Sequence, residues 1–236
     1  MAVVTALTVQ NTQRVLRVHL PPADFVAAEI DAVFDDIDVH AVKIGMLGSS
    51  EIARAVADRL KRKSLSIILD PVLAATSGNA LGTSDLVGVL RDELMPLANL
   101  VTPNLLEAAR LADQPVPRDV EEMQRIAERL HGLGVPAVLV KGGHLAAEAT
   151  DVLFDGKSHR RFTSPRVDTR GETHGTGCTL AAAIAAYGGK GLSLPDAVKA
   201  AKKYVTEALR ASRDLRVGHG AAPLDHLYGL RPRLDG

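Results

Sequence analysis

Tryptophan is absent from this 236-residue chain, aromatic residues make up only 3% of it, and Cys178 is its single cysteine. With so few aromatic side chains, the sequence lacks the stacking platforms on which proteins hold single-stranded nucleic acid. A lone cysteine cannot form an internal disulfide bond, and this is typical of proteins from a reducing compartment. These absences argue against a nucleic-acid-binding role and against a secreted, disulfide-held protein.

The chain also lacks an excess of charge of either sign, since 28 Lys and Arg residues balance 28 Asp and Glu residues. A neutral balance gives no long-range attraction to nucleic acid or to an anionic membrane. The first apolar stretch, residues 2–9, is short and is interrupted by Thr5 and Thr8, unlike a signal peptide or a membrane span. We therefore expect a cytoplasmic protein whose partner is a small molecule.

Hydrophobic residues form 46% of the chain, which is enough for a buried core. Short β-branched runs alternate with longer amphipathic stretches, a pattern typical of βαβ units around a parallel sheet. No fixed-period repeat interrupts it, so we expect residues 1–236 to form a single α/β domain. Strands are predicted over residues 2–9, 66–69, 100–102 and 137–140 and up to Gly45, with a hairpin over residues 151–162. Helices are predicted over residues 21–37, 52–60, 105–112, 120–133 and 175–186, with a last one lined by Val198, Ala201, Val205 and Leu209.

Polar side chains follow several of these predicted strands. In open parallel sheets, ligands bind beyond the carboxyl ends of the strands, so the residues there are candidates for a site. One lysine, two carboxylates and several amides suit phosphates and a divalent cation, which needs hard oxygen ligands and neutralisation of charge. The candidates are Gln10, Gly45, Met46, Asp70, Asn104, Glu107 and Lys141.

The sharpest local feature is the segment 174–179, His-Gly-Thr-Gly-Cys-Thr, which leads directly into an Ala-rich helix. Glycines allow the backbone to approach an anion, and the first N–H groups of a helix have no partner within it. We therefore predict that Gly175, Thr176 and Gly177 hold a transferring phosphoryl group. Cys178 lies at the positive end of the helix dipole, which favours the thiolate and makes this residue a candidate general base.

Each of these features also has a purely structural explanation. A Gly-Thr-Gly sequence often serves close packing of a helix against a strand, and a lone cysteine is more often a small buried apolar residue than a catalyst. Asp70 before proline can be a turn former, Glu107 can complement a helix dipole, and Met46 can fill the core. No cluster has the spacing of a zinc site, so no histidine is assigned to a metal.

Taken together, the motifs resemble the hydroxymethylpyrimidine and phosphomethylpyrimidine kinases of thiamine biosynthesis, which belong to the ribokinase-like superfamily. Residues 175–179 look like the anion-hole motif of that family, with Cys178 where sugar kinases of the superfamily have aspartate. The other matching segments, in family order, are Val9-Gln10-Asn11-Thr12, Lys43-Ile44-Gly45-Met46-Leu47, Asp70-Pro71-Val72, Thr102-Pro103-Asn104 with Glu107-Ala108, Lys141-Gly142-Gly143-His144-Leu145, and Gly218-His219-Gly220 with Pro223 and Asp225-His226.

The resemblance implies a three-layer α/β/α ribokinase-like fold, a homodimer, and ATP-dependent phosphorylation of 4-amino-5-hydroxymethyl-2-methylpyrimidine and its monophosphate. It implies that Lys141 neutralises ATP phosphates and that Lys202 reaches the nucleotide. The implied contacts to the pyrimidine are Gln10, Met46 and Val72, and the implied organisers of Mg²⁺ and phosphates, partly through water, are Asp70, Asn104 and Glu107.

Two alternatives stay open at this point. Some vitamin B6 kinases share the Gly-Thr-Gly-Cys motif and also phosphorylate a hydroxymethyl group on an aromatic ring, so a pyridoxal or pyridoxine kinase is the nearest rival. The family also normally has a strand, a glycine-rich loop and an acidic substrate-binding residue before the segment that opens this chain. If the sequence is complete, one strand and part of the substrate pocket would be lacking. A shortened reading frame or a non-catalytic, ligand-binding relic would explain this difference.

Overall fold

The structure, a computed structural model, describes residues 1–73, 83, 85–143, 148–168, 173–213, 215 and 217–230. Within these residues, six strands form a central sheet in the order β3-β4-β5-β6-β7-β8. The first four strands are parallel to one another, and the last two are antiparallel to their neighbours. The strands are β3 (Ala41–Ile44), β4 (Ser66–Leu69), β5 (Leu100–Val101), β6 (Val138–Val140), β7 (Ala149–Phe154) and β8 (His159–Ser164). The predicted mostly parallel sheet is confirmed.

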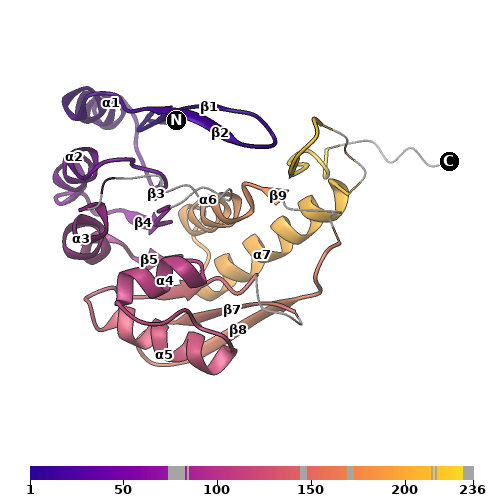
Figure 1. Ribbon diagram of the computed structural model, residues 1–236. Coiled ribbons are helices and arrows are strands. Elements are labelled where there is room, and N and C mark those ends of the chain that lie inside the picture. Colours follow the sequence, from indigo (N-terminus) through magenta and orange to yellow (C-terminus); the bar gives the residue numbers. More distant parts are fainter. Residues whose placement is uncertain are drawn as a thin grey trace.

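Helices cover both faces of this sheet, which confirms the expected three-layer α/β/α arrangement (Figure 1). One face carries α1 (Ala23–Asp36), α2 (Ser50–Leu60), α3 (Leu86–Val89), α4 (Leu105–Ala112) and α5 (Val120–His131). The opposite face carries α6 (Thr176–Gly189) and α7 (Leu194–Ala211). Helix α3 was not predicted, and neither were the π-helical turn, Leu90–Leu94, and the 3-10 turn, Met95–Leu97, that continue it.

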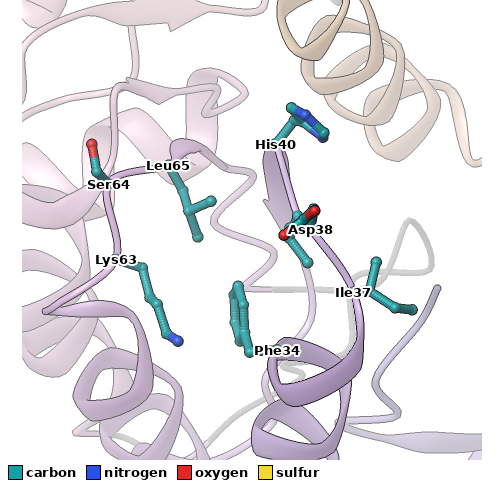
Figure 2. A pocket seen from close by; sticks show the side chains of 8 residues that line it. Phe34, Ile37, Asp38, His40, Lys63, Ser64 and Leu65 are labelled. Carbon is teal, nitrogen blue, oxygen red and sulfur yellow. The ribbon is translucent and has the colours of Figure 1, made fainter.

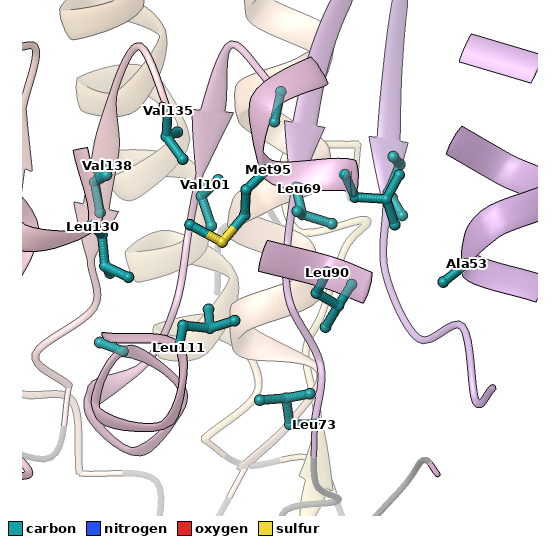
Figure 3. Packing of buried hydrophobic residues seen from close by; sticks show 14 of the residues in the cluster. Ala53, Leu69, Leu73, Leu90, Met95, Val101, Leu111, Leu130, Val135 and Val138 are labelled. Atoms are coloured by element: carbon teal, nitrogen blue, oxygen red, sulfur yellow. The ribbon is translucent and has the colours of Figure 1, made fainter. Parts of the chain in front are cut away.

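The alternation of side chains along the strands divides the core between the two faces. Ile67 and Leu69 of β4 pack into the cluster beneath α1–α5, while Ile68 between them packs against α6 and α7. Successive strand residues point to opposite faces, so a strand buried on both sides must be apolar throughout. Figure 3 shows the larger cluster, in which Met95 lies near Val101 of β5.

The first predicted strand, residues 2–9, is only partly correct. Within the described chain, β1 (Leu7–Gln10) does not join the central sheet and pairs antiparallel with β2 (Val15–His19), which was not predicted. Most residues of the two strands are exposed. A short apolar run indicates extended backbone but does not identify the partner strand, and this explains the error.

The predicted hairpin and two further short strands show where local sequence patterns succeed and where they fail. The predicted hairpin is confirmed, because Asp155 Oδ1 accepts hydrogen bonds from two backbone N–H groups of the turn and Gly156 has a φ of 81°. Two short strands, β9 (Thr173–His174) and β10 (Ala222–Pro223), were missed because two residues show no periodicity.

His144 and Leu145 of the Lys141 segment lie outside the described residues. In the described part of the chain, no helix is long and apolar enough to cross a membrane.

Candidate active site

The carboxyl ends of the parallel strands bring distant polar residues together. Asp70 follows β4 and Lys141 follows β6, and the Lys141 Nζ atom lies 2.7 Å from Asp70 Oδ1. Asn104, which follows β5, forms an isolated parallel bridge with Lys141. Because neighbouring parallel strands end at the same edge of a sheet, residues far apart in sequence form one cluster there.

Asp70 is the most deeply buried member of this cluster, with 2% of its side chain exposed. Thr102 Oγ1 donates to Asp70 Oδ1 at 3.3 Å, and the Lys43 Nζ atom lies 3.7 Å from Oδ2. Burial alone would raise the pKa of the carboxyl, but Lys141 and then Lys43 outweigh it and hold the pKa of Asp70 below its usual value. Asp70 is therefore ionised, and among the described residues no donor completes a hydrogen bond to its buried Oδ2.

Glu107 is the second buried carboxylate, and it forms a reciprocal cap with Asn104 at the start of α4. The backbone N–H of Glu107 donates to Asn104 Oδ1 at 2.9 Å, and the backbone N–H of Asn104 donates to Glu107 Oε2 at 2.8 Å. Burial raises the pKa of Glu107 although Lys141 opposes the shift, and the nearby Asp70 carboxylate adds to it. The cap therefore fixes a second carboxyl group beside the Lys141–Asp70 pair.

Lys141 connects the strand ends with the start of α6. Burial would lower the pKa of its ammonium group, but Asp70 and Glu107 raise the pKa above its usual value, so Lys141 stays charged. A Cβ atom added to Gly177 would lie only 3.0 Å from Lys141 Nζ. The ammonium group therefore lies directly against the first turn of α6.

The first turn of α6 is shaped by glycine. Gly175 is the N-cap residue and has a φ of 85°, a conformation that side chains other than glycine rarely adopt. The first hydrogen bond of the helix runs from Thr179 N to Gly175 O, at 2.8 Å. An α-helix leaves its first N–H groups without an acceptor inside the helix, so the turn and the Lys141 ammonium group together can hold an anion.

Cys178 lies in this turn, and its side chain is exposed rather than sealed in the core. Desolvation and the Asp70 carboxylate raise the pKa of its thiol, although Lys43 and Lys141 oppose the shift. The surroundings of Cys178 as a whole therefore favour the neutral thiol rather than the expected thiolate, and the sequence does not reveal that a buried carboxylate lies beside the thiol.

Lys43 is the first residue of the matching segment 43–47, but no role was predicted for it. It is the third residue of β3, and its ammonium group approaches both Asp70 and the Cys178 thiol. A lysine inside an apolar parallel strand is unusual, and this was the available signal.

Lys202 forms an ion pair with Asp151, a residue for which no role in the site was predicted. Its Nζ atom lies 2.6 Å from Asp151 Oδ2, and the two side chains are 12% and 7% exposed. The other oxygen of Asp151 accepts a hydrogen bond from Gly142 N at 3.0 Å. Lys202 therefore supports, through Asp151, the loop that directly follows Lys141.

The three residues expected to contact the pyrimidine lie on two different parts of the fold. Met46 and Val72 are half-buried and follow the neighbouring strands β3 and β4, on the same edge as Asp70. Gln10 is exposed and ends β1, so it lies on the separate hairpin. Met46 and Val72 therefore lie on the same edge of the sheet as the Asp70–Lys141 cluster, whereas Gln10 lies on the β1–β2 hairpin.

A hollow elsewhere on the molecule is not part of this site. Figure 2 shows it between the end of α1 and the segments that precede β3 and β4, with Phe34, His40 and Lys63 among its lining residues. It lies at the amino ends of those strands, opposite the edge that carries Asp70. Within the described residues, no group of three His, Cys, Asp or Glu side chains could hold a metal ion by itself.

Comparison with known proteins identifies the family of this chain. A model of the family described as phosphomethylpyrimidine kinase matches residues 1–225. The hydroxymethylpyrimidine/phosphomethylpyrimidine kinase of Rhizobium meliloti (strain 1021) is 49% identical over 228 residues, which cover 96% of this chain and 85% of that protein.

Solved structures show the same relationship. The phosphomethylpyrimidine kinase from Clostridium difficile 630 superposes with a TM-score of 0.77 at 37% identity, covering 89% of this chain and 86% of that one. An ADP complex of Bacillus subtilis pyridoxal kinase gives a TM-score of 0.84 at 32% identity, covering 95% of this chain and 83% of that one. The resemblance found in the sequence is confirmed, and the chain belongs to the phosphomethylpyrimidine kinase family, with its ribokinase-like fold.

Proposed function

We propose that the protein transfers the γ-phosphoryl group of ATP to the hydroxymethyl group of 4-amino-5-hydroxymethyl-2-methylpyrimidine, and to the phosphate of its monophosphate, in thiamine biosynthesis. The observation that carries the proposal is the convergence of Lys141 and Asp70 on the first turn of α6, where Cys178 lies. Membership of the phosphomethylpyrimidine kinase family supports the pyrimidine as the acceptor.

The first turn of α6 is assigned to the transferring phosphoryl group. The N–H groups of Gly175, Thr176, Gly177 and Cys178 precede the first hydrogen bond of the helix, and Lys141 adds a compact positive charge at the same place. Donors that are already in position stabilise the charge on the phosphoryl oxygens with little reorganisation during the reaction. These groups therefore form the anion hole of the proposed kinase.

The two buried carboxylates fit a Mg²⁺–nucleotide. Mg²⁺ is usually held by one or two carboxylates together with water and phosphate oxygens, and among the described residues no donor satisfies the buried Asp70 Oδ2. When bound, the ion would neutralise charge on the phosphates. Asn104 keeps the Glu107 carboxylate in place through the cap of α4. Lys202 serves the nucleotide side of the site through Asp151 and the loop after Lys141.

Cys178 is the proposed general base. As a thiolate, its Sγ atom accepts the hydroxyl proton while the alcohol oxygen forms a bond to the γ-phosphorus, and the bond from that phosphorus to the β-phosphate oxygen breaks, releasing ADP. The pKa of the thiol is raised, so the thiolate is the minor form near neutral pH.

The acceptor is assigned to the space between the sheet edge and the hairpin. Met46 and Val72 contribute apolar contacts from the ends of β3 and β4, and Gln10 contributes an amide from β1. An amide can hydrogen-bond the amino group and the ring nitrogens of a pyrimidine, since it carries both a donor and an acceptor.

The proposed function is tested by measuring ADP release with two alcohols, the hydroxymethylpyrimidine and pyridoxal. Pyridoxal is the second candidate, because the solved pyridoxal kinase from Bacillus subtilis is structurally similar. We expect kcat/KM to be higher for the pyrimidine by about tenfold or more, because its polar groups have partners in a matched site. Reversed preference would favour a vitamin B6 kinase. No ADP release with either alcohol would favour a non-catalytic, ligand-binding protein.

We also propose that the protein forms a homodimer through the β1–β2 hairpin. Leu7, Val9 and Leu16 on this hairpin are about half exposed, at 54%, 49% and 56%. Apolar side chains that gather on an exposed surface often mark a protein–protein interface. Light scattering is expected to give twice the 25.0 kDa mass of one chain, and replacing Leu16 with Asp should return the particle to that mass. A single-chain mass for the unaltered protein would contradict the proposal.

A further inference from the structure

Two sequence motifs that are far apart in the chain meet at the tip of the β1–β2 hairpin. Thr12 lies in the turn between the two strands, and residues 218–221 belong to the C-terminal segment. The backbone N–H of Ala221 donates to Thr12 O at 2.8 Å, and that of Gly220 donates to Thr12 Oγ1 at 3.1 Å. Figure 1 shows the hairpin tip directed toward the yellow C-terminal segment. We name the contact between Thr12 and residues 218–221 the Thr12 latch.

In the latch, the C-terminal segment approaches Thr12 so closely that two of its positions require glycine. Gly218 has a φ of 70°, and a Cβ atom there would lie 2.5 Å from Thr12 Oγ1. A Cβ atom on Gly220 would collide with the carbonyl group of Thr12. Any larger residue at either position would therefore push the C-terminal segment away from the hairpin.

Away from its tip, the hairpin is attached at its base. Most residues of both strands are exposed, while Val3 and Leu20 at the base pack against the core beneath α1–α5. At its base, Thr5 Oγ1 donates to Met46 O at 2.5 Å and Val4 N donates to Glu29 Oε2 at 3.3 Å. Gln10 lies between this base and Thr12, so its position depends on the attachments at both ends.

The other side of the latch leads to the phosphoryl-binding turn. Directly after residues 218–221, strand β10 pairs in parallel with β9, with Ala222 opposite Thr173 and Pro223 opposite His174. Gly175, the N-cap of α6, follows β9 without an intervening residue. The tip of the hairpin is thus connected through one short path of hydrogen bonds and backbone to the turn that carries Cys178.

We propose that the Thr12 latch positions the acceptor alcohol relative to the phosphoryl-binding turn, so that Thr12, Gly218 and Gly220 are positioning residues of this site. The inference rests on the proposed kinase function and deepens it. Gln10 of the hairpin and Gly175 of the turn are held in register by the same contact, so loss of the contact would displace the Gln10 amide from the pyrimidine and weaken the binding of that substrate. Lys141 and Asp70 follow strands of the central sheet, so the nucleotide contacts that they provide should not depend on the latch.

The experiment compares Gly218→Ala and Thr12→Val with the unaltered protein. Both variants should raise KM for the pyrimidine by about tenfold or more while KM for ATP changes by less than about twofold. Hydrogen exchange of the amides of residues 11–14 and 220–221 should become faster in both. Thr12→Val preserves the shape of the side chain and removes only the hydroxyl group, so it is expected to fold.

Two controls are matched to these variants. Gly134→Ala introduces a Cβ at a φ of 96°, where nothing lies within 4 Å, so it carries the backbone strain of Gly218→Ala without the collision. Thr12→Ser keeps the hydroxyl group that accepts from Gly220 N. Both controls should keep the KM for the pyrimidine of the unaltered protein.

The outcomes separate the latch from the proposed function. If the unaltered protein releases ADP and both latch variants keep its KM for the pyrimidine, the latch proposal is overturned, even where hydrogen exchange is faster. An equal rise of both KM values would also overturn it, since that result indicates general loosening. If the unaltered protein releases no ADP with either alcohol, the proposed function fails, and the role of the latch toward the alcohol fails with it.

Discussion

Replacing Cys178 with alanine is expected to lower kcat by about 10²- to 10⁴-fold, the usual contribution of a general base, while the affinity for ATP stays within about twofold. The thiol lies in the first turn of α6 beside Asp70, Lys43 and Lys141, so its loss removes the proton acceptor but none of the charges that would hold phosphates. Turnover is measured by ADP release at saturating substrates, and affinity by titration with ATP.

Cys178→Ser is the matched variant, because serine keeps the size and the hydrogen-bonding capacity of the side chain. Its hydroxyl group is a far weaker acid than a thiol, so at neutral pH it should be nearly as slow as the alanine variant. Turnover of Cys178→Ala within about threefold of the unaltered protein would remove Cys178 from the mechanism.

The raised pKa of Cys178 predicts the pH dependence of its reactivity. Because the folded-state pKa lies above the usual value of a thiol, the thiolate fraction should stay small at neutral pH and grow only in the alkaline range. Alkylation by iodoacetamide in metal-free buffer should follow that curve. Lys43→Met should shift its midpoint to higher pH, because Lys43 lowers the pKa of the thiol, whereas Lys63→Met should not. A midpoint near neutrality would contradict this account.

Replacing Lys141 with methionine is expected to lower kcat/KM by about 10²- to 10³-fold, comparable with the loss of one positioned group that stabilises transition-state charge. It should also reduce the free energy of unfolding by about 3 kcal/mol, because the buried Asp70 carboxylate loses its partner at 2.7 Å. Lys43, at 3.7 Å, offsets part of that loss. Denaturant titration measures the stability, and ADP release measures the activity.

The double variant Asp70→Asn/Lys141→Met separates the two effects. With no charge left unpaired in the pair, we expect most of the lost stability to return while turnover stays low. Lys141→Arg should keep the charge and much of the stability, but a planar guanidinium group does not replace a compact ammonium group in contact with Gly177. Near-normal turnover of folded Lys141→Met would exclude the lysine from the site.

The central sheet and most of the helices that cover it were predicted correctly, because short-range sequence patterns mark their positions. Strand β4 and helix α4 agree with their predicted bounds, because the apolar run before Asp70-Pro71 and the helical run after Pro103-Asn104 are short-range patterns. The turn at Gly175 was likewise predicted, since only glycine accepts its backbone conformation readily.

The predictions that were wrong concern features set by residues distant in the sequence, namely the pairing of the first strand and the pKa of Cys178. The first strand was expected to belong to a βαβ unit, but β1 pairs with β2, and the pairing partner of a short strand is not encoded locally. The Cys178 thiolate was expected to be favoured, but desolvation and the Asp70 carboxylate raise the pKa of the thiol, and Asp70 is 108 positions away in the chain although it lies beside the thiol in space.

By itself, the sequence determined the order of the elements, the alternation that divides the core between two helical layers, and the residue types at the strand ends and in the glycine turn. These depend on periodicity and on backbone preferences, which act over a few residues. The tertiary structure alone decided that Lys43 approaches Asp70, that Lys202 holds Asp151, and that Thr12 meets the C-terminal glycines. Such contacts depend on how the elements pack, because charge interactions and close backbone approaches are set by distance in space rather than along the chain.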